Sequence, residues 1–170
     1  MISSQEEKAR PFRRFFRKLL SINASAALNA LTISGNYGVN TLIGTGFNDL
    51  INGNRGNDNL TGGLGADTFR FDSTLNATSN RDTITDFNVG QGDRIELENS
   101  VFTVLTTTGV LNANAFVVGT AATTASHRII YNSTTGTLTY DSNGNAAGGT
   151  TVFAQLGAGL GLNAGMFTVT

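Results

Sequence analysis

The chain has 170 residues, enough for one domain with a substantial core, and 39% of them are hydrophobic. Charged residues make up only 14%, whereas there are 21 glycines and one proline, a balance that disfavours charge-driven disorder and favours short strands joined by turns. The absence of Cys excludes disulfides and thiolate metal sites, and no apolar run approaches the roughly 18 residues of a membrane span.

The N-terminal arm differs in charge from the rest of the chain. Residues 1–20 carry six Lys or Arg and two acids, whereas the remaining 150 residues carry five Arg, ten acids and no Lys. Five apolar residues fall at helical spacing opposite the basic ones: Phe12, Phe15, Phe16, Leu19 and Leu20. We therefore predict a basic amphipathic helix in an arm of residues 1–25. The helix either binds an anionic lipid or polysaccharide surface or covers the end of the following fold. A twin-arginine export signal at Arg13-Arg14 is disfavoured by the weak apolar segment that follows.

Residues 35–70 repeat with a period of nine. Glycine opens each unit, at Gly35, Gly44, Gly53 and Gly62. The sixth place holds Asn40, Asp49, Asp58 and Asp67, and the eighth holds Leu42, Ile51, Leu60 and Phe69. The fourth unit matches every fixed place of the G-G-x-G-x-D-x-U-x calcium-binding repeat. A flexible linker would not place an apolar residue at every ninth position, so the pattern predicts a folded repeat.

Each unit is predicted to be a tight turn followed by a very short strand, because the glycines permit unusual backbone dihedrals. Two units make one coil of a flattened spiral, so the first unit stacks under the third and the second under the fourth, about 4.8 Å apart. Ile33 continues the apolar register nine residues before Leu42, which makes 26–34 a degenerate cap. We predict a calcium-binding β-roll over residues 26–72.

Stacked turns bring oxygen ligands together, and Ca²⁺ takes roughly 6–8 of them. Asn40 and Asp58 would supply the side chains of a first site, and Asp49 and Asp67 those of a second. Turn carbonyls would complete the shells, from Asn36, Gly38, Gly53 and Arg55 in the first site and from Thr45, Phe47, Gly62 and Leu64 in the second. Without metal the paired carboxylates repel, so Ca²⁺ should drive folding. Asn40 makes the first site the weaker one, and Phe47, where Gly is usual, indicates a distorted second turn.

The remaining residues, 73–170, are predicted to form a β cap. Strands are expected at 68–71, 82–87 and 94–97, and a hairpin within 128–141. Asp86 and Asp93 either bind a further calcium ion or accept hydrogen bonds from turn N–H groups. Asp141 begins what looks like half of a calcium loop. Val152 stands where an EF-hand has Glu, which favours a solvated turn.

A pattern at 111–118 recurs at 162–169, the end of the chain. Leu, Asn and Ala open both copies, and an aromatic residue and valine follow. The second copy has the small, lysine-free character of a type I secretion signal. Two edge strands that complete the cap are an equally compatible interpretation.

The repeats resemble those of the RTX (repeats-in-toxin) family of secreted bacterial calcium-binding proteins. Residues 66–71, 82–87 and 92–97 resemble the C-terminal domain of serralysin-type proteases, and the likeness covers residues 33–170. It implies a parallel β-roll capped by antiparallel strands, calcium binding, and export by type I secretion machinery that reads an uncleaved C-terminal signal. The only histidine is His127, so the protease's metal-binding histidine cluster is absent.

The expected fold class is all-β: a short parallel β-roll of nonapeptide repeats, an antiparallel β C-terminal region as its cap, and an N-terminal basic helix. The expected function is that of a secreted, extracellular calcium-binding protein whose roll folds on Ca²⁺. We predict no enzyme activity, because one histidine, no thiol and two lysines in the arm leave no catalytic constellation. The alternatives are a calcium-dependent polysaccharide- or surface-binding module and the detached secretion tail of a larger exported enzyme. No nucleic-acid partner is expected.

Overall fold

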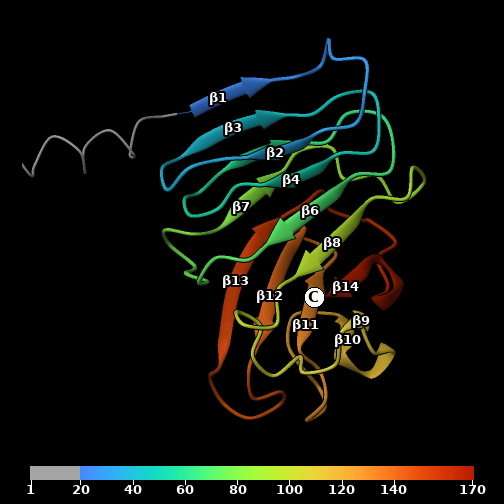
Figure 1. The fold of residues 1–170 in the computed structure, drawn as a ribbon. Coiled ribbons are helices and arrows are strands. Elements are labelled where there is room, and N and C mark those ends of the chain that lie inside the picture. The colour runs from blue at the N-terminus through green and yellow to red at the C-terminus, as the bar shows by residue number, and fades with distance from the viewer. Residues whose placement is uncertain (1–19) are drawn as a thin grey trace, which may run out of the picture.

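The computed structural model describes residues 20–170, which form two sheets that run the length of the molecule (Figure 1). The order of the larger sheet is β1 (Leu20–Asn23), β3 (Asn40–Ile43), β5 (Asn59–Thr61), β7 (Asp82–Ile84), β13 (Thr150–Gln155), β12 (Thr137–Asp141), β11 (Ile129–Asn132) and β10 (Phe116–Val118). The order of the smaller is β2 (Thr32–Ser34), β4 (Leu50–Asn52), β6 (Thr68–Phe71), β8 (Arg94–Leu97), β14 (Phe167–Val169) and β9 (Gly109–Val110). Short 3-10 helices at Ala113–Ala115 and Ala164–Met166 precede β10 and β14. The described residues contain no helix long and apolar enough to cross a membrane.

The repeats wind into the predicted spiral. Strand partners lie 18 residues apart and run parallel, as in Leu42↔Leu60 and Ile33↔Ile51. The four apolar eighth-place side chains of the repeats are 0% exposed and stack inside the roll: Leu42, Ile51, Leu60 and Phe69. One apolar residue per unit is therefore enough to build a continuous core, because each coil covers the next.

The parallel stack extends beyond the repeats at both ends. At the start, β1 pairs with β3 and sets Ile22 beside Leu42, so the prediction that Leu20 belongs to a helix is wrong. Ile22 packs against the core and the edge of β3 is paired, which favours a strand there. The rest of the predicted basic helix lies outside the described residues. At the other end, β7 adds to β5 and β8 to β6, past residue 72.

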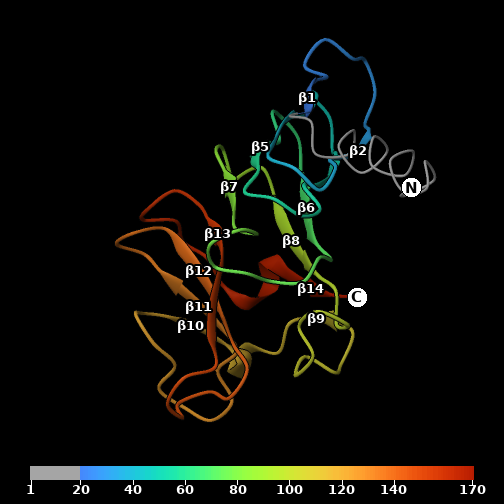
Figure 2. The same ribbon diagram turned by 90° about the vertical axis from the view of Figure 1, so that its left-hand side faces the viewer.

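The cap is joined to the roll by shared sheets. The predicted hairpin is present, with β11 and β12 antiparallel, and β13 then pairs antiparallel with β12 and parallel with β7. Phe71 from the roll meets Phe153 from β13 edge-to-face at 5.1 Å, and Phe102 meets Phe153 at 5.2 Å. Figure 2 shows the two sheets as two layers, each of which continues from the roll into the cap.

Two predicted strands differ from the structure in detail. The strand expected at 82–87 ends at Ile84, because the following Asp86 turns towards the backbone of the previous coil. Of the two pattern copies interpreted as edge strands, β10 does lie at a sheet edge, whereas β14 lies between β8 and β9. The last residues of the chain are therefore part of the buried core, with Phe167 0% exposed.

Candidate metal centre

The sixth-place side chains of the repeats form two columns, one on each side of the roll. Asp49, Asp58 and Asp67 each accept a hydrogen bond from the backbone N–H of the residue 18 positions earlier, one coil before. The Asn40 N–H donates to Asp58 Oδ1 at 2.7 Å, and the Asp49 N–H donates to Asp67 Oδ1 at 2.8 Å. All four side chains are buried, with exposed fractions of 0 to 3%. The structure thus brings together both pairs of side chains that the sequence predicts as calcium ligands.

The first two turns satisfy their own sixth-place side chains. The Asn36 N–H donates to Asn40 Oδ1 at 2.6 Å, and the Thr45 N–H donates to Asp49 Oδ2 at 2.6 Å. The Thr45 hydroxyl also donates to Asp49 Oδ1 at 3.1 Å. Each of these turns therefore closes on itself through local hydrogen bonds.

The third and fourth turns leave one carboxylate oxygen unpartnered. Asp58 Oδ2 and Asp67 Oδ2 are both buried, and no N–H or hydroxyl group of the described residues donates to either atom. The Asp82 carboxyl group lies against that of Asp58 and can donate to it only when protonated. The N–H groups that could have reached them are engaged elsewhere. The Asn54 N–H donates to Asn52, and the Gly62 and Gly63 N–H groups donate to Asp86. A buried carboxylate oxygen without a donor is costly, and a cation is one group that satisfies it.

The electrostatics of the buried carboxylates favour a cation at this site. Burial raises the pKa of Asp58 to about 6, and burial together with the charges of Asp93, Asp49 and Asp86 raises the pKa of Asp67 to about 6. Burial, and then the charge of Asp58, raises the pKa of Asp82 to about 8. A bound divalent cation would reverse this, because it stabilises the ionised carboxylates.

The backbone of the third and fourth turns takes the left-handed conformation that the repeat's glycines permit. The second and fourth places have φ values of 65° at Asn54 and 133° at Gly56 in the third unit. The corresponding values are 104° at Gly63 and 114° at Gly65 in the fourth. The same places in the first two units do not have positive φ. The third and fourth turns thus have a different shape from the first two, and only glycine or asparagine fits it easily.

The third and fourth turns lie very close to the turns of the preceding coil. Several predicted carbonyl ligands therefore lie between stacked turns. A Cβ added to Gly56 would collide with the carbonyl oxygen of Gly38, and one added to Gly63 with that of Thr45. A Cβ added to Gly65 would likewise collide with the carbonyl group of Phe47. In the preceding coil, Gly35 lies against the carbonyl of Gly53, and Gly44 lies against the carbonyl of Gly62. Calcium ligation by any of these carbonyls, and by those of Asn36, Arg55 and Leu64, stays a prediction, and the side chains of Arg55 and Leu64 are exposed.

The donor set fits Ca²⁺. Every candidate ligand atom is an oxygen, and the carboxylate, amide and carbonyl oxygens match the preference of this hard cation. Over residues 20–170, no three side chains of His, Cys, Asp or Glu gather into a metal-binding group. An ion between stacked turns would thus take most of its shell from backbone carbonyls, which explains why turn shape and glycine content matter.

Asp82 was missed by the sequence analysis. It continues the column of Asp58, whose N–H donates to Asp82 Oδ1 at 3.0 Å, and it is only 4% exposed. The spacing from Asp58 is 24 residues instead of 18, so the residue falls outside the nonapeptide register. The signal that could have found it is the Asp82-Thr83-Ile84 triplet, an aspartate two places before a buried residue, as in the repeats.

The other candidate acids accept turn hydrogen bonds. Asp86 accepts from Gly62 and Gly63, both at 2.9 Å, and Asp93 Oδ1 accepts from the Asp67 N–H at 3.0 Å. Burial raises the pKa of Asp93. Asp141 is buried and accepts from the Asn143 N–H at 3.1 Å. Calcium binding by these three residues stays a prediction.

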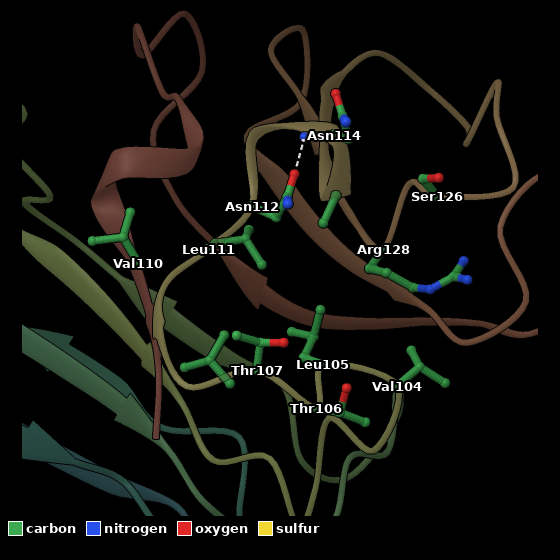
Figure 3. Close-up of a pocket in the computed structure, with 12 residues that line it drawn as sticks. Val104, Leu105, Thr106, Thr107, Val110, Leu111, Asn112, Asn114, Ser126 and Arg128 are labelled. Atoms are coloured by element: carbon green, nitrogen blue, oxygen red, sulfur yellow. Dashed lines mark hydrogen bonds between the residues drawn. The ribbon is translucent and has the colours of Figure 1, made fainter.

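A cavity of about 440 Å³ lies in the C-terminal half, away from the repeats (Figure 3). Leu105 and Leu111 form part of its apolar lining, and Ser126 and Arg128 stand at its polar side. The Arg128 guanidinium donates to the His127 carbonyl at 2.9 Å. None of the lining residues is Asp, Glu, His or Lys, so this cavity offers no acid–base pair for catalysis.

Comparison with known proteins agrees with this geometry. Residues 34–69 match the model of the RTX calcium-binding nonapeptide repeat in four copies. A search of the curated proteins finds no match. The structure is similar to the AlgE6R3 subunit of the mannuronan C5-epimerase of Azotobacter vinelandii, with a TM-score of 0.52 and 26% identity over 90% of this chain and 79% of that one. The AlgE6R2 subunit of the same epimerase gives a TM-score of 0.49 and 27% identity over 89% of this chain and 91% of that one. Residues 34–69 are thus RTX calcium-binding repeats, and they form the centre of a calcium-binding β-roll.

Proposed function

We propose that the protein is exported in an unfolded state and that its roll folds on binding Ca²⁺ outside the cell. The observation that carries this proposal is the pair of buried, unpartnered oxygens, Asp58 Oδ2 and Asp67 Oδ2, within calcium-binding repeats. An unsatisfied buried polar group costs roughly 1–3 kcal/mol, and a charged one costs more. Two of them consume a large share of the roughly 5–15 kcal/mol that stabilises a domain. Calcium removes this cost and couples metal binding to folding.

The cap gives independent support for export before folding. Phe167 and Val169 belong to the segment that resembles a type I secretion signal, yet both are buried in β14. Secretion machinery that reads this segment would have to meet it while the chain is still unfolded. Low calcium inside the cell and high calcium outside would keep folding and export in that order.

Circular dichroism tests calcium-driven folding directly. The full chain should show weak strand signal after calcium is stripped and strong strand signal in millimolar Ca²⁺. The Asp49→Ala/Asp67→Ala variant should lose this response, whereas Glu98→Gln, which changes an acid outside the metal columns, should keep it. Equal strand signal of the wild type in both conditions would reject the proposal.

A second candidate function is calcium-dependent binding of an acidic polysaccharide, with the protein acting as a binding module without catalysis. The likeness to a subunit of an epimerase that is named for mannuronan, a polymer of a uronic acid, favours it. Calcium-dependent retention of the full chain on immobilised polymannuronate would support this candidate. Elution of the calcium-loaded protein in the unbound fraction would reject it.

A further inference from the structure

Tyr37 and Arg55 form an exposed stack on one turn face of the roll. They occupy the third places of the first and third units and lie one coil apart. The Arg55 guanidinium lies over the Tyr37 ring, 5.4 Å from its centroid, and Tyr37 is 66% exposed. Stacking on an aromatic ring orients a guanidinium while its N–H edge can still meet an anion.

Arg81 lies on the same turn face one coil further along, over Asn57 in the fifth place of the third unit. Its backbone N–H donates to Asn57 Oδ1 at 2.9 Å, and Asn57 Nδ2 donates to the Thr78 carbonyl at 3.0 Å. These bonds hold the chain around Arg81 against the third turn, to which Arg55 also belongs. A hollow of about 240 Å³ lies between Arg55 and the residues that precede Arg81, and Asn76 and Ser79 line it. We call Tyr37, Arg55 and Arg81 the turn strip.

The turn strip carries two positive charges that form no ion pair with an acid of the described residues. Within residues 20–170 the ion pairs involve Arg70, and neither Arg55 nor Arg81 takes part in one. The acids of this side, Asp58 and Asp82, are buried beneath the strip, with 2% and 4% exposure. The opposite turn face carries no charge at the corresponding places of the repeats, which are Gly46, Asn48, Leu64 and Ala66.

We propose that the turn strip binds the carboxylates of a uronic-acid polysaccharide, in which charges recur along an extended chain. The proposal rests on the second candidate function and names its site. Arg55 and Arg81 come from successive coils, and their guanidinium groups can each pair with a carboxylate. The Tyr37 ring supplies a flat apolar surface for the face of a sugar.

Calcium switches the turn strip on in two ways. The three residues come from three different coils, so they are neighbours only when the coils are stacked. A calcium ion held by Asp58 also neutralises the carboxylate beneath the strip, which would otherwise oppose a polyanion. Binding of the polysaccharide should therefore follow the calcium-induced folding transition.

The test is binding of polymannuronate oligomers of defined length to the full chain in millimolar Ca²⁺, measured by titration calorimetry. Arg55→Gln and Arg81→Gln should each weaken binding roughly fivefold, and the double variant more than tenfold. Tyr37→Ser should weaken it and Tyr37→Phe should not. Each variant should keep the calcium-induced strand signal, which separates loss of the site from loss of the fold.

The matched control is Arg128→Gln, which removes the same charge from the cavity of the C-terminal half. It should bind as the wild type does, and a neutral dextran of equal length should not bind. The proposal is overturned if the double arginine variant binds as tightly as the wild type, or if Arg128→Gln is the variant that loses binding. A wild-type chain that folds on calcium but does not bind polymannuronate overturns both the strip and the polysaccharide-binding function, and leaves calcium-driven folding intact. A double arginine variant that binds as the wild type does overturns the strip alone.

Discussion

The first two turns of the roll and the last two share one repeat but differ in how they treat the metal-binding side chain. In the lower turns, residues 35–40 and 44–49, a backbone N–H of the same turn donates to Asn40 and to Asp49, and the Leu31 N–H and the Thr45 hydroxyl satisfy the other oxygen of Asp49. In the upper turns, residues 53–58 and 62–67, left-handed backbone leaves Asp58 and Asp67 each with one buried oxygen unpartnered. The lower turns are locally complete, whereas the upper turns need a ligand.

The sequence explains part of this difference. Thr45 and Phe47 occupy the second and fourth places of the second unit, and a side chain there disfavours left-handed backbone. Asn54, Gly56, Gly63 and Gly65 at the same places of the upper units accept it. Asn40 is moreover neutral, so it needs no counter-charge. The comparison teaches that calcium dependence is concentrated in the upper turns, although all four units match the same repeat.

The largest expected effect comes from removing the upper carboxylates. Asp58→Ala/Asp67→Ala should abolish the calcium-induced strand signal, because both ions lose their best ligand. The matched lower variant, Asn40→Ala/Asp49→Ala, should still fold on calcium, with roughly tenfold weaker affinity. Calcium titrations followed by circular dichroism compare the two. Equal loss in both variants would contradict the division into lower and upper turns.

Turn shape gives the next effect. Gly63→Ala should destabilise the calcium-loaded roll by about 2–4 kcal/mol, because its φ of 104° disfavours a Cβ and the Thr45 carbonyl occupies the space. Gly46→Ala, in the lower turn of the same side, should change stability by less than about 0.5 kcal/mol, because nothing lies within 4 Å of its added Cβ. Urea unfolding in calcium measures both, and similar midpoints would refute the assigned turn shapes.

Protonation of the buried carboxylates should stabilise the metal-free roll in part, as bound calcium does. Burial raises the pKa of Asp58 and Asp67 to about 6 and, with the charge of Asp58, that of Asp82 to about 8. The unfolded chain loses these protons near pH 4, so the metal-free roll binds more protons than the unfolded chain between about pH 4 and 8 and loses stability as the pH rises. Metal-stripped protein should therefore show more strand signal at pH 5 than at pH 8. Calcium should bind more tightly at pH 8. Metal-free strand signal that grows with pH would contradict this sign.

The smallest expected effect comes from adding a carboxylate to a lower turn. Asn40→Asp adds a carboxylate to the first site, so it should tighten calcium binding there by roughly threefold to tenfold. Asn145→Asp, an exposed change far from the repeats, is the control and should leave affinity unchanged. Calorimetric titration resolves the difference. Weaker binding by Asn40→Asp would mean that Asn40 does not face an ion.

Periodic features of the roll were predictable from the sequence, whereas features that break the period were not. Thr68–Phe71 and Arg94–Leu97 are strands as predicted, because alternating apolar residues mark them. The place of Asp82 in the column was not predicted, because the loop between β6 and β7 shifts this residue out of the register of nine. The strand at Leu20–Asn23 was not predicted for two reasons. Its partners in β3 lie 20 residues away instead of 18, and the residues before it have apolar side chains at helical spacing.

The two conformations of the turns could not be predicted fully. Phe47 indicated a distorted second turn, and the second turn does lack the left-handed residues of the fourth. The first turn lacks them too, although Asn36 and Gly38 would tolerate that conformation. Its shape depends on contacts with the coil above, including the approach of Gly56 to the Gly38 carbonyl, and a single repeat does not encode those contacts.

Amide hydrogen exchange tests calcium-driven closure of the upper turns most directly, because the N–H groups of Asn40, Asp49, Asp58 and Asp67 all donate into the aspartate columns. We predict that in calcium these four amides exchange orders of magnitude more slowly than in metal-stripped protein at the same pH. Equal protection of the four amides with and without calcium would contradict the account.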